Sequence, residues 1–258
     1  MVVTGDAVSQ DEVWYQDVEP EPQRLDANFR ERRVVEENAI PSKPHPQIRG
    51  LLIGAPRPLL PNSVEAALGP RHREVLDDLE DLLRSGDLAK LTIRQLAAHL
   101  GCSRRTLYEL APSKDALFLL VFDRLLHRLG RTAMSAVDVS APASVQIRQY
   151  ASTSVGYTFQ SAAYEDLLDV PEARRTLDRH YRFAATVLER IVASGTSSGE
   201  FRAVDSSVVA HMILACADHF AKPDVLDDLG LSHDEAKGAM LEILLAGLRN
   251  PVAAVRSK

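Results

Sequence analysis

The amino-acid sequence predicts an all-α protein, and three observations support this. Ala and Leu are abundant, whereas aromatic residues make up only 5% of the chain. Apolar residues recur at spacings of three and four, as they do along one face of a helix, and no alternating Val/Ile run bounded by turn residues occurs. The length of 258 residues, 45% of them hydrophobic, suits a small helical module followed by a larger helical domain.

Residues 1–61 differ in composition from the rest of the chain. They hold 8 of the 14 prolines, and the first 21 residues carry six acidic side chains and no Lys or Arg. This composition is typical of a disordered or loosely docked arm. Trp14, the single tryptophan, could anchor the arm on the folded body. The arm has two interpretations, a segment that contacts a partner and a solvated extension with no specific role, and the second is the more ordinary one.

Two short helices joined by a tight turn are predicted between residues 92 and 111. Thr92 and Gln95 form a capping box at the start of the first helix. Gly101 follows where the chain must reverse, Ser103 offers a second N-cap, and Pro112 ends the second helix. This pattern predicts a helix-turn-helix, locked together by the apolar residues Ile93, Leu96, Ala97, Leu100 and Leu107.

Amphipathic helices are predicted on both sides of this motif. Pro70 opens one that Gly86 would cap, and another follows the N-cap Ser113 and continues an apolar face to Gly130. Further helical segments are expected over residues 143–160, 171–194, 207–221 and 232–248. In the last one, an apolar stripe is expected to face a second copy of the chain; it consists of Met240, Leu241, Leu244, Leu245 and Leu248.

Basic residues gather on the helix-turn-helix, although the whole chain has a net charge of −6. That overall charge is opposite to what a general nucleic-acid coat needs, so any contact with DNA must come from a local patch. Such a patch occurs between residues 88 and 114, where Glu109 is the only acidic residue and the basic ones are Lys90, Arg94, Arg104, Arg105 and Lys114.

The stretch LTIRQLAAHLGCSRRTLYELAPSKDAL resembles the DNA-binding signature of TetR-family transcriptional regulators, including the T-L-Y of the second helix and the S-K-D that opens the next. The resemblance covers about residues 70–120. Two positions depart from the family pattern, because Arg105 stands where a Gly is common and Leu110 and Ala111 replace an aromatic pair. We therefore expect the arm over 1–61, a three-helix DNA-binding domain over 62–118, and a helical-bundle domain for ligand binding and dimerisation over 119–258.

The expected DNA contacts follow from this resemblance and from the side-chain chemistry. Thr92 lies at a helix N-terminus, where it can bind a phosphate oxygen or only cap its own helix. Tyr108 and Lys114 match family positions that hold the DNA backbone, and packing inside the domain is the alternative for Tyr108. Arg side chains can donate two hydrogen bonds to guanine. The full expected set is Thr92, Arg94, Ser103, Arg104, Arg105, Thr106, Tyr108 and Lys114.

The resemblance also implies a small, largely apolar effector, bound in the larger domain without a cofactor. The residues expected to line its site, which at helical spacing could equally be ordinary core, are Phe122, Tyr150, Tyr157, Tyr164, His180, Tyr181, Phe183 and Met212. The predicted protein is a homodimeric regulator, most simply a repressor, that binds a palindromic DNA operator and is released by the effector. The alternative is a helical adaptor that acts mainly through a protein partner.

Signals for other functions are weak. Residues 195–199 read G-x-S-x-G, but a nucleophile elbow needs a strand before it and here a helix precedes, so no enzyme is expected. Cys216 and His219 lie three apart with only His211 nearby, so no metal site is expected. No apolar run approaches the roughly 18 residues of a membrane span, and we expect a cytoplasmic protein.

Overall fold

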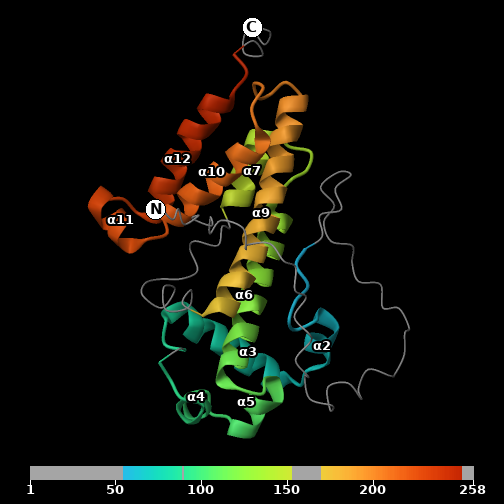
Figure 1. Ribbon diagram of the computed structural model, residues 1–258, viewed down its shortest axis with the longest axis vertical. Helices are drawn as coiled ribbons and strands as arrows, with labels where there is room; N and C mark the ends of the chain where they lie inside the picture. The colour runs from blue at the N-terminus through green and yellow to red at the C-terminus, as the bar shows by residue number, and fades with distance from the viewer. Residues whose placement is uncertain (1–54, 89, 153–169, 252–258) are drawn as a thin grey trace, which may run out of the picture. The chain divides into compact units, whose positions relative to one another are not determined.

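The computed structural model describes residues 55–88, 90–152 and 170–251, which belong to one compact unit (Figure 1). Within these ranges the chain is helical, and its β pairing is limited to an isolated antiparallel bridge between Phe201 and Arg249. The all-α prediction is therefore confirmed. The helices are α2 (Asn62–Ala67), α3 (Pro70–Ser85), α4 (Ile93–His99), α5 (Arg104–Leu110), α6 (Lys114–Ala136), α7 (Ala143–Ala151), α9 (Pro171–Ser197), α10 (Ser206–His219), α11 (Pro223–Leu229) and α12 (His233–Leu248).

Local signals place the helix ends around the predicted helix-turn-helix. The amide of Gln95 donates to Thr92 Oγ1 at 3.3 Å, and the amide of Thr92 donates to Gln95 Oε1 at 2.9 Å, so the capping box is present. Gly101 turns the chain with a φ of 58°, and Ser103 Oγ then accepts from the Thr106 amide at 3.1 Å. The structure confirms the predicted helix-turn-helix, α4 and α5, and the helix α3 that precedes it.

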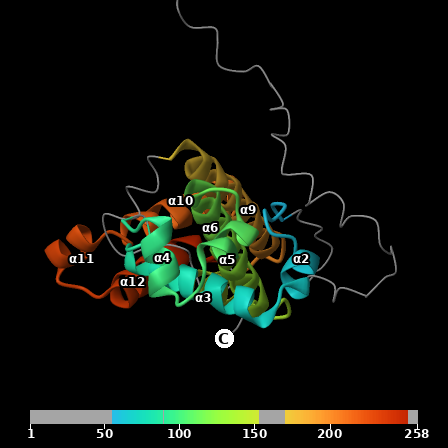
Figure 2. The ribbon, with the colours of Figure 1, turned by 90° about the horizontal axis from the view of Figure 1, so that it is seen from below.

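The first of two apolar cores joins α3, α4, α5 and the first half of α6, which lie together at one end of α6 (Figure 2). Its centre is made of fully buried Leu76, Leu96, Leu107 and Leu117. Leu60, in the segment before α2, is also buried there, so the last residues of the predicted arm pack on this domain. Arm residues before 55, including Trp14, lie outside the described residues.

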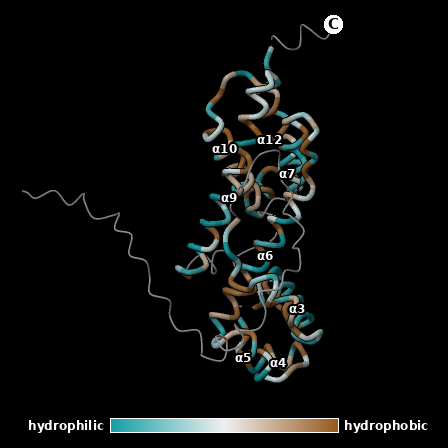
Figure 3. Tube along the Cα trace, turned by 90° about the vertical axis from the view of Figure 1, so that its right-hand side faces the viewer, coloured by the Kyte–Doolittle hydropathy of each residue, from teal (hydrophilic) through white to brown (hydrophobic). Residues whose placement is uncertain are grey.

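The second apolar core is built from the end of α6 with α7, α9, α10 and α12. α6 and α9 run side by side (Figure 1), and both contribute residues to the two cores. The brown segments of the tube mark where hydrophobic residues lie along the chain (Figure 3). Phe201 is buried in this second core beside Gly195 of α9, where an added Cβ would clash with the ring. The carboxylate of Glu200 accepts the first backbone amides of α7, from Ala143 at 2.6 Å and Ser144 at 3.0 Å.

Three expectations about helix ends and faces were wrong. α6 does not end at Gly130 but passes through it, because a glycine inside a helix costs only about 1 kcal/mol relative to Ala. Nothing lies within 4 Å of a Cβ added at this position. α9 continues through Gly195 to Ser197, so the G-x-S-x-G residues begin inside a helix. The apolar stripe on α12, expected to face a second copy of the chain, is partly used inside the chain. Its residues Leu241, Leu245 and Leu248 are buried in the second core.

No helix among the described residues is long and apolar enough to cross a membrane. The helical segment expected over residues 143–160 is described only as far as residue 152, where α7 has ended.

Candidate DNA interface and effector region

The surface of α5 carries most of the predicted DNA contacts. Leu107 and Leu110 are buried in the first core and fix this helix, so its other side faces solvent. Arg104 and Arg105 are exposed there, and Tyr108 keeps 52% of its surface accessible. Because Tyr108 is a large aromatic residue left outside a well-packed core, the structure does not favour the alternative that it packs within the domain.

The arginines of this surface differ in what holds them. Arg105 Nε donates to Glu109 Oε1 at 2.9 Å, and the other oxygen of Glu109 lies 3.1 Å from His72 Nε2. The hydrogen bond from Arg105, with a smaller contribution from His72, lowers the pKa of Glu109. Arg94 and Arg104 form no ion pair with any other described residue. Unlike Arg105, these two arginines have no ion pair among the described residues to give up before binding another group.

The remaining predicted contacts lie at or near helix starts. Ser103 and Thr106 share a hydrogen bond between their hydroxyl groups of 3.0 Å, which extends the cap of α5. Thr92 is exposed while capping α4, so its cap role is shown and a phosphate contact remains a prediction. Lys114 is the first residue of α6 and is partly buried.

Arg71 is a supporting residue that the sequence did not reveal. Its guanidinium donates to the carbonyl of Leu100 and, at 3.0 Å, to that of Gly101. These carbonyls belong to the turn between α4 and α5, so Arg71 ties the turn to α3. The two ends of this contact are 30 residues apart, and no local pattern links them.

A largely buried ionic network joins α2 and α3 to α6. Arg124 on α6 is hydrogen-bonded to Glu80 and, at 2.9 Å, to Asp77, both on α3, and at 2.7 Å to Glu65 on α2. Arg128 adds bonds of 2.9 Å to Glu80 and 3.1 Å to Asp77. Glu80 is only 2% exposed, and its burial raises its pKa in spite of these arginines. Arg124 stands three residues after buried Val121, so helical spacing places it on the inward face of α6. A charged residue on that face needs an ion-pair partner.

Those residues predicted to line an effector site that the structure describes do not gather in one place. Phe122 is buried in the first core, and Tyr150 in the second. Phe183 packs on the second core, and Tyr181 is partly buried, which raises the pKa of its phenol. Met212 is exposed on α10 and borders a shallow hollow with Val208 and His211. Two further predicted residues, Tyr157 and Tyr164, lie outside the described residues.

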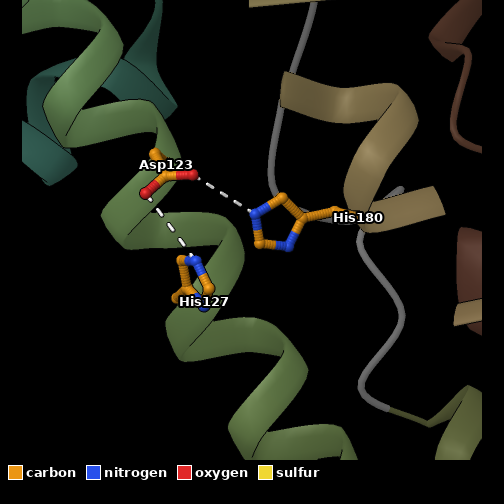
Figure 4. Close-up of side chains that lie close together, drawn as sticks. All are labelled: Asp123, His127 and His180. Carbon is orange, nitrogen blue, oxygen red and sulfur yellow. Dashed lines mark hydrogen bonds and ion pairs between the residues drawn. The ribbon is translucent and has the colours of Figure 1, made fainter. Parts of the chain in front are cut away.

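His180, the remaining predicted effector residue, belongs to a buried polar cluster between α9 and α6 (Figure 4). Its Nε2 lies 3.4 Å from Oδ1 of fully buried Asp123, and His127 Nε2 lies 3.7 Å from the other oxygen. The Leu59 amide donates to Asp123 at 2.7 Å. Burial alone would raise the pKa of Asp123, but the hydrogen bonds from His180 and Leu59 lower it. Burial lowers the pKa of His127 to about 4, so this imidazole is neutral near pH 7.

Two family models match the chain in separate regions. One describes bacterial regulatory proteins of the tetR family and matches residues 75–121, which contain the helix-turn-helix. The other describes the tetracyclin repressor-like C-terminal domain and matches residues 167–239. No curated protein matches the sequence.

Solved structures share the fold at low sequence identity. A protein of Saccharomonospora viridis in complex with choline has 16% identity and a TM-score of 0.59, over 69% of this chain and 97% of its own. The TetR-family regulator from Cytophaga hutchinsonii has 15% identity and a TM-score of 0.58, over 70% and 98%. The fatty acid degradation regulator FadR from Bacillus halodurans has 15% identity and a TM-score of 0.56, over 71% and 98%.

Proposed function

The chain belongs to the TetR family of bacterial transcriptional regulators, and on this basis we propose that it is a repressor that binds a palindromic DNA operator as a homodimer. Members of this family are DNA-binding proteins without enzymatic activity. The observation that carries the proposal is the exposed, basic surface of α5, held in place by a helix-turn-helix whose capping and turn residues are all present.

In the proposed complex, α5 lies in the major groove. Arg104 has no ion pair to give up among the described residues, so it is the best candidate for a bidentate bond to guanine. Thr92, Ser103, Tyr108 and Lys114 contact the backbone and set the register, as phosphate contacts generally do. The ion pair of Arg105 with Glu109 must open before Arg105 reads a base, so we expect it to contribute less than Arg104.

A dimer follows from apolar side chains that the single chain leaves uncovered on α10 and α12. Val208 and Met212 are 55% and 51% exposed on α10, and Ile243 is 76% exposed on α12. Large apolar residues in this position suit a two-fold interface in which each pair of helices meets its copy. Such a dimer presents two α5 helices to successive major grooves and therefore a palindromic site.

The proposed effector is a small, largely apolar molecule bound in the larger domain, and α6 transmits its effect. α6 begins at Lys114, carries the Arg124 network to α3 and ends in the second core. An effector shifts the equilibrium only if it prefers the conformation in which the α5 helices no longer match the groove spacing. A coupling of about 1–3 kcal/mol would weaken operator binding about 5–150-fold. The choline complex shows that a protein of similar fold binds a small molecule.

The decisive experiment selects operators from random double-stranded DNA and then titrates variants by fluorescence anisotropy. Arg104→Ala should cost about 1–3 kcal/mol and relax specificity at one base pair. Lys114→Ala should weaken all sequences alike and lower the salt slope by about 1. The control is Arg148→Ala, which removes an exposed charge from α7. If both variants bind like the control, the assigned DNA surface is wrong, and if no sequence is retained, an adaptor function becomes the better explanation.

A further inference from the structure

The polar cluster between α6 and α9 has a composition that the effector hypothesis does not explain. Asp123 and His127 are four residues apart on α6, so their side chains lie on one face of the helix, and His180 approaches from α9 (Figure 4). Among the described residues, this is the one group of three or more His, Cys, Asp or Glu side chains whose donor atoms converge, and these atoms lie within 4.8 Å of one another. A largely apolar effector has no use for three such groups.

We propose that Asp123, His127 and His180 bind a divalent transition-metal ion of the Zn²⁺ type. Zinc takes His nitrogen and carboxylate oxygen at about 2.0–2.2 Å, which in a tetrahedral site sets the donor atoms roughly 3.3–3.5 Å apart. His180 Nε2 lies 3.4 Å from Oδ1 of Asp123, and His127 Nε2 lies 3.7 Å from its other oxygen, Oδ2, so each nitrogen is close to this spacing from one carboxylate oxygen. One ligand atom from each of the three residues lies within 4.8 Å of the other two, so side-chain rotation must shorten the longest separation before all three donors reach bonding distance. The proposal goes beyond the DNA-binding function and does not depend on it.

The surroundings of the cluster support a metal site. His127 Nε2 is buried and has no hydrogen-bond partner among the described residues, although an unsatisfied buried nitrogen is normally costly. Bonding to a metal would satisfy it. The Leu59 amide holds one oxygen of Asp123 at 2.7 Å, the type of outer contact that orients a metal-binding carboxylate. Arg179 is the competing cation, but its Nη2 stays 4.0 Å from Asp123 and its side chain is 44% exposed, so it can turn into solvent.

The donor set indicates the class of ion. Imidazole and carboxylate ligands suit Zn²⁺, Co²⁺, Ni²⁺ or Fe²⁺, whereas Ca²⁺ and Mg²⁺ prefer sites made of oxygen alone. Three protein ligands leave at least one coordination position for water or another donor. The ion would also join α6 to α9, since its ligands come from both helices.

The test uses the full-length protein after treatment with EDTA and buffer exchange. Zn²⁺ is titrated by isothermal calorimetry, and Co²⁺ is added separately to record its visible d–d absorption. We expect one ion per chain and the intense absorption of cobalt with four or five ligands. His127→Gln and His180→Gln should each reduce the affinity by more than the 10–100-fold that is typical for loss of an outer-shell partner. His219→Gln, which changes the nearest alternative set on α10, should bind as the parent protein does.

Folding of each variant is checked without metal by circular dichroism and thermal unfolding. Asp123→Asn should also lose binding, and if this buried substitution unfolds the protein, the two His variants carry the test. The proposal is overturned if both His variants bind Zn²⁺ like the parent, if cobalt keeps the spectrum of the hydrated ion, or if only His219→Gln loses binding. Loss confined to the three cluster variants, with their fold intact, establishes the site.

Discussion

Substitution of Arg124 by Met tests whether the ionic network, rather than apolar contact alone, fixes the DNA-binding helices on α6. The change keeps a long, partly apolar side chain and removes the charge. Glu80, at 2% exposure, would then keep only its bond to Arg128, and removal of one partner from a buried pair costs about 3–5 kcal/mol. Asp77 is largely exposed and should add little. Because Arg128 remains, we expect the free energy of unfolding to fall by about 3 kcal/mol. This corresponds to a fall in Tm of about 6–12 °C for a chain of this size.

The assay is thermal and urea unfolding at fixed protein concentration, repeated at several pH values. Burial already raises the pKa of Glu80 above its ordinary value of 4.5, and loss of Arg124 should raise it further. In the pH range between the ordinary pKa and the raised one, the folded variant binds a proton that the unfolded chain does not, so its stability falls as pH rises. The difference in stability between the parent protein and the Arg124→Met variant should therefore become smaller towards pH 4.5. A loss below about 1 kcal/mol, or a deficit that widens on acidification, would refute the reasoning.

Three further predictions concern packing and assembly. Leu60→Ala should lower the free energy of unfolding by about 2–3 kcal/mol in urea titrations, because Leu60 is buried in the first core. The variant keeps residues 1–54 unaltered, so the effect reports on Leu60 alone. Gly195→Ala should lower the free energy of unfolding by about 1–3 kcal/mol, since its Cβ would meet Phe201. Gly238→Ala has open space inside α12 and should raise it by about 0.5–1 kcal/mol, and equal effects of the two substitutions would contradict this. Ile243→Glu should dissociate the proposed dimer in sedimentation velocity, and Val145→Glu should not.

The features that the sequence predicted correctly are those set by residues close together in the chain. The capping box of Thr92 and Gln95 and the turn at Gly101 each depend on neighbours three or four positions away. Apolar spacing likewise showed which residues of α4 and α5 face inwards. Because such patterns do not show which helices meet, the contact of Arg124 with Glu80, 44 residues apart, could not be predicted.

The polar cluster shows the same limit. The side-chain type of His180 suggests a place in a binding site, but its partner Asp123 is 57 residues away on another helix. The helix end predicted at Gly195 is wrong for a related reason. A glycine near the end of a helical pattern usually indicates the end, yet here the helix continues and the missing Cβ gives room to Phe201.

The bond between Glu200 and the start of α7 bears on the order of folding. Pro142, the N-cap residue of α7, provides no side-chain cap, so the carboxylate that accepts the Ala143 and Ser144 amides comes from 56–57 residues further along the chain. The first turn of α7 therefore gains its cap only after α9 has docked and has brought Glu200 back. α4 and α5 carry their caps within three residues, as α6, α10 and α12 also do, so these helices need no such closure to gain a cap. The recognition element is locally encoded, while the bundle that would respond to an effector becomes complete only when distant parts of the chain have met.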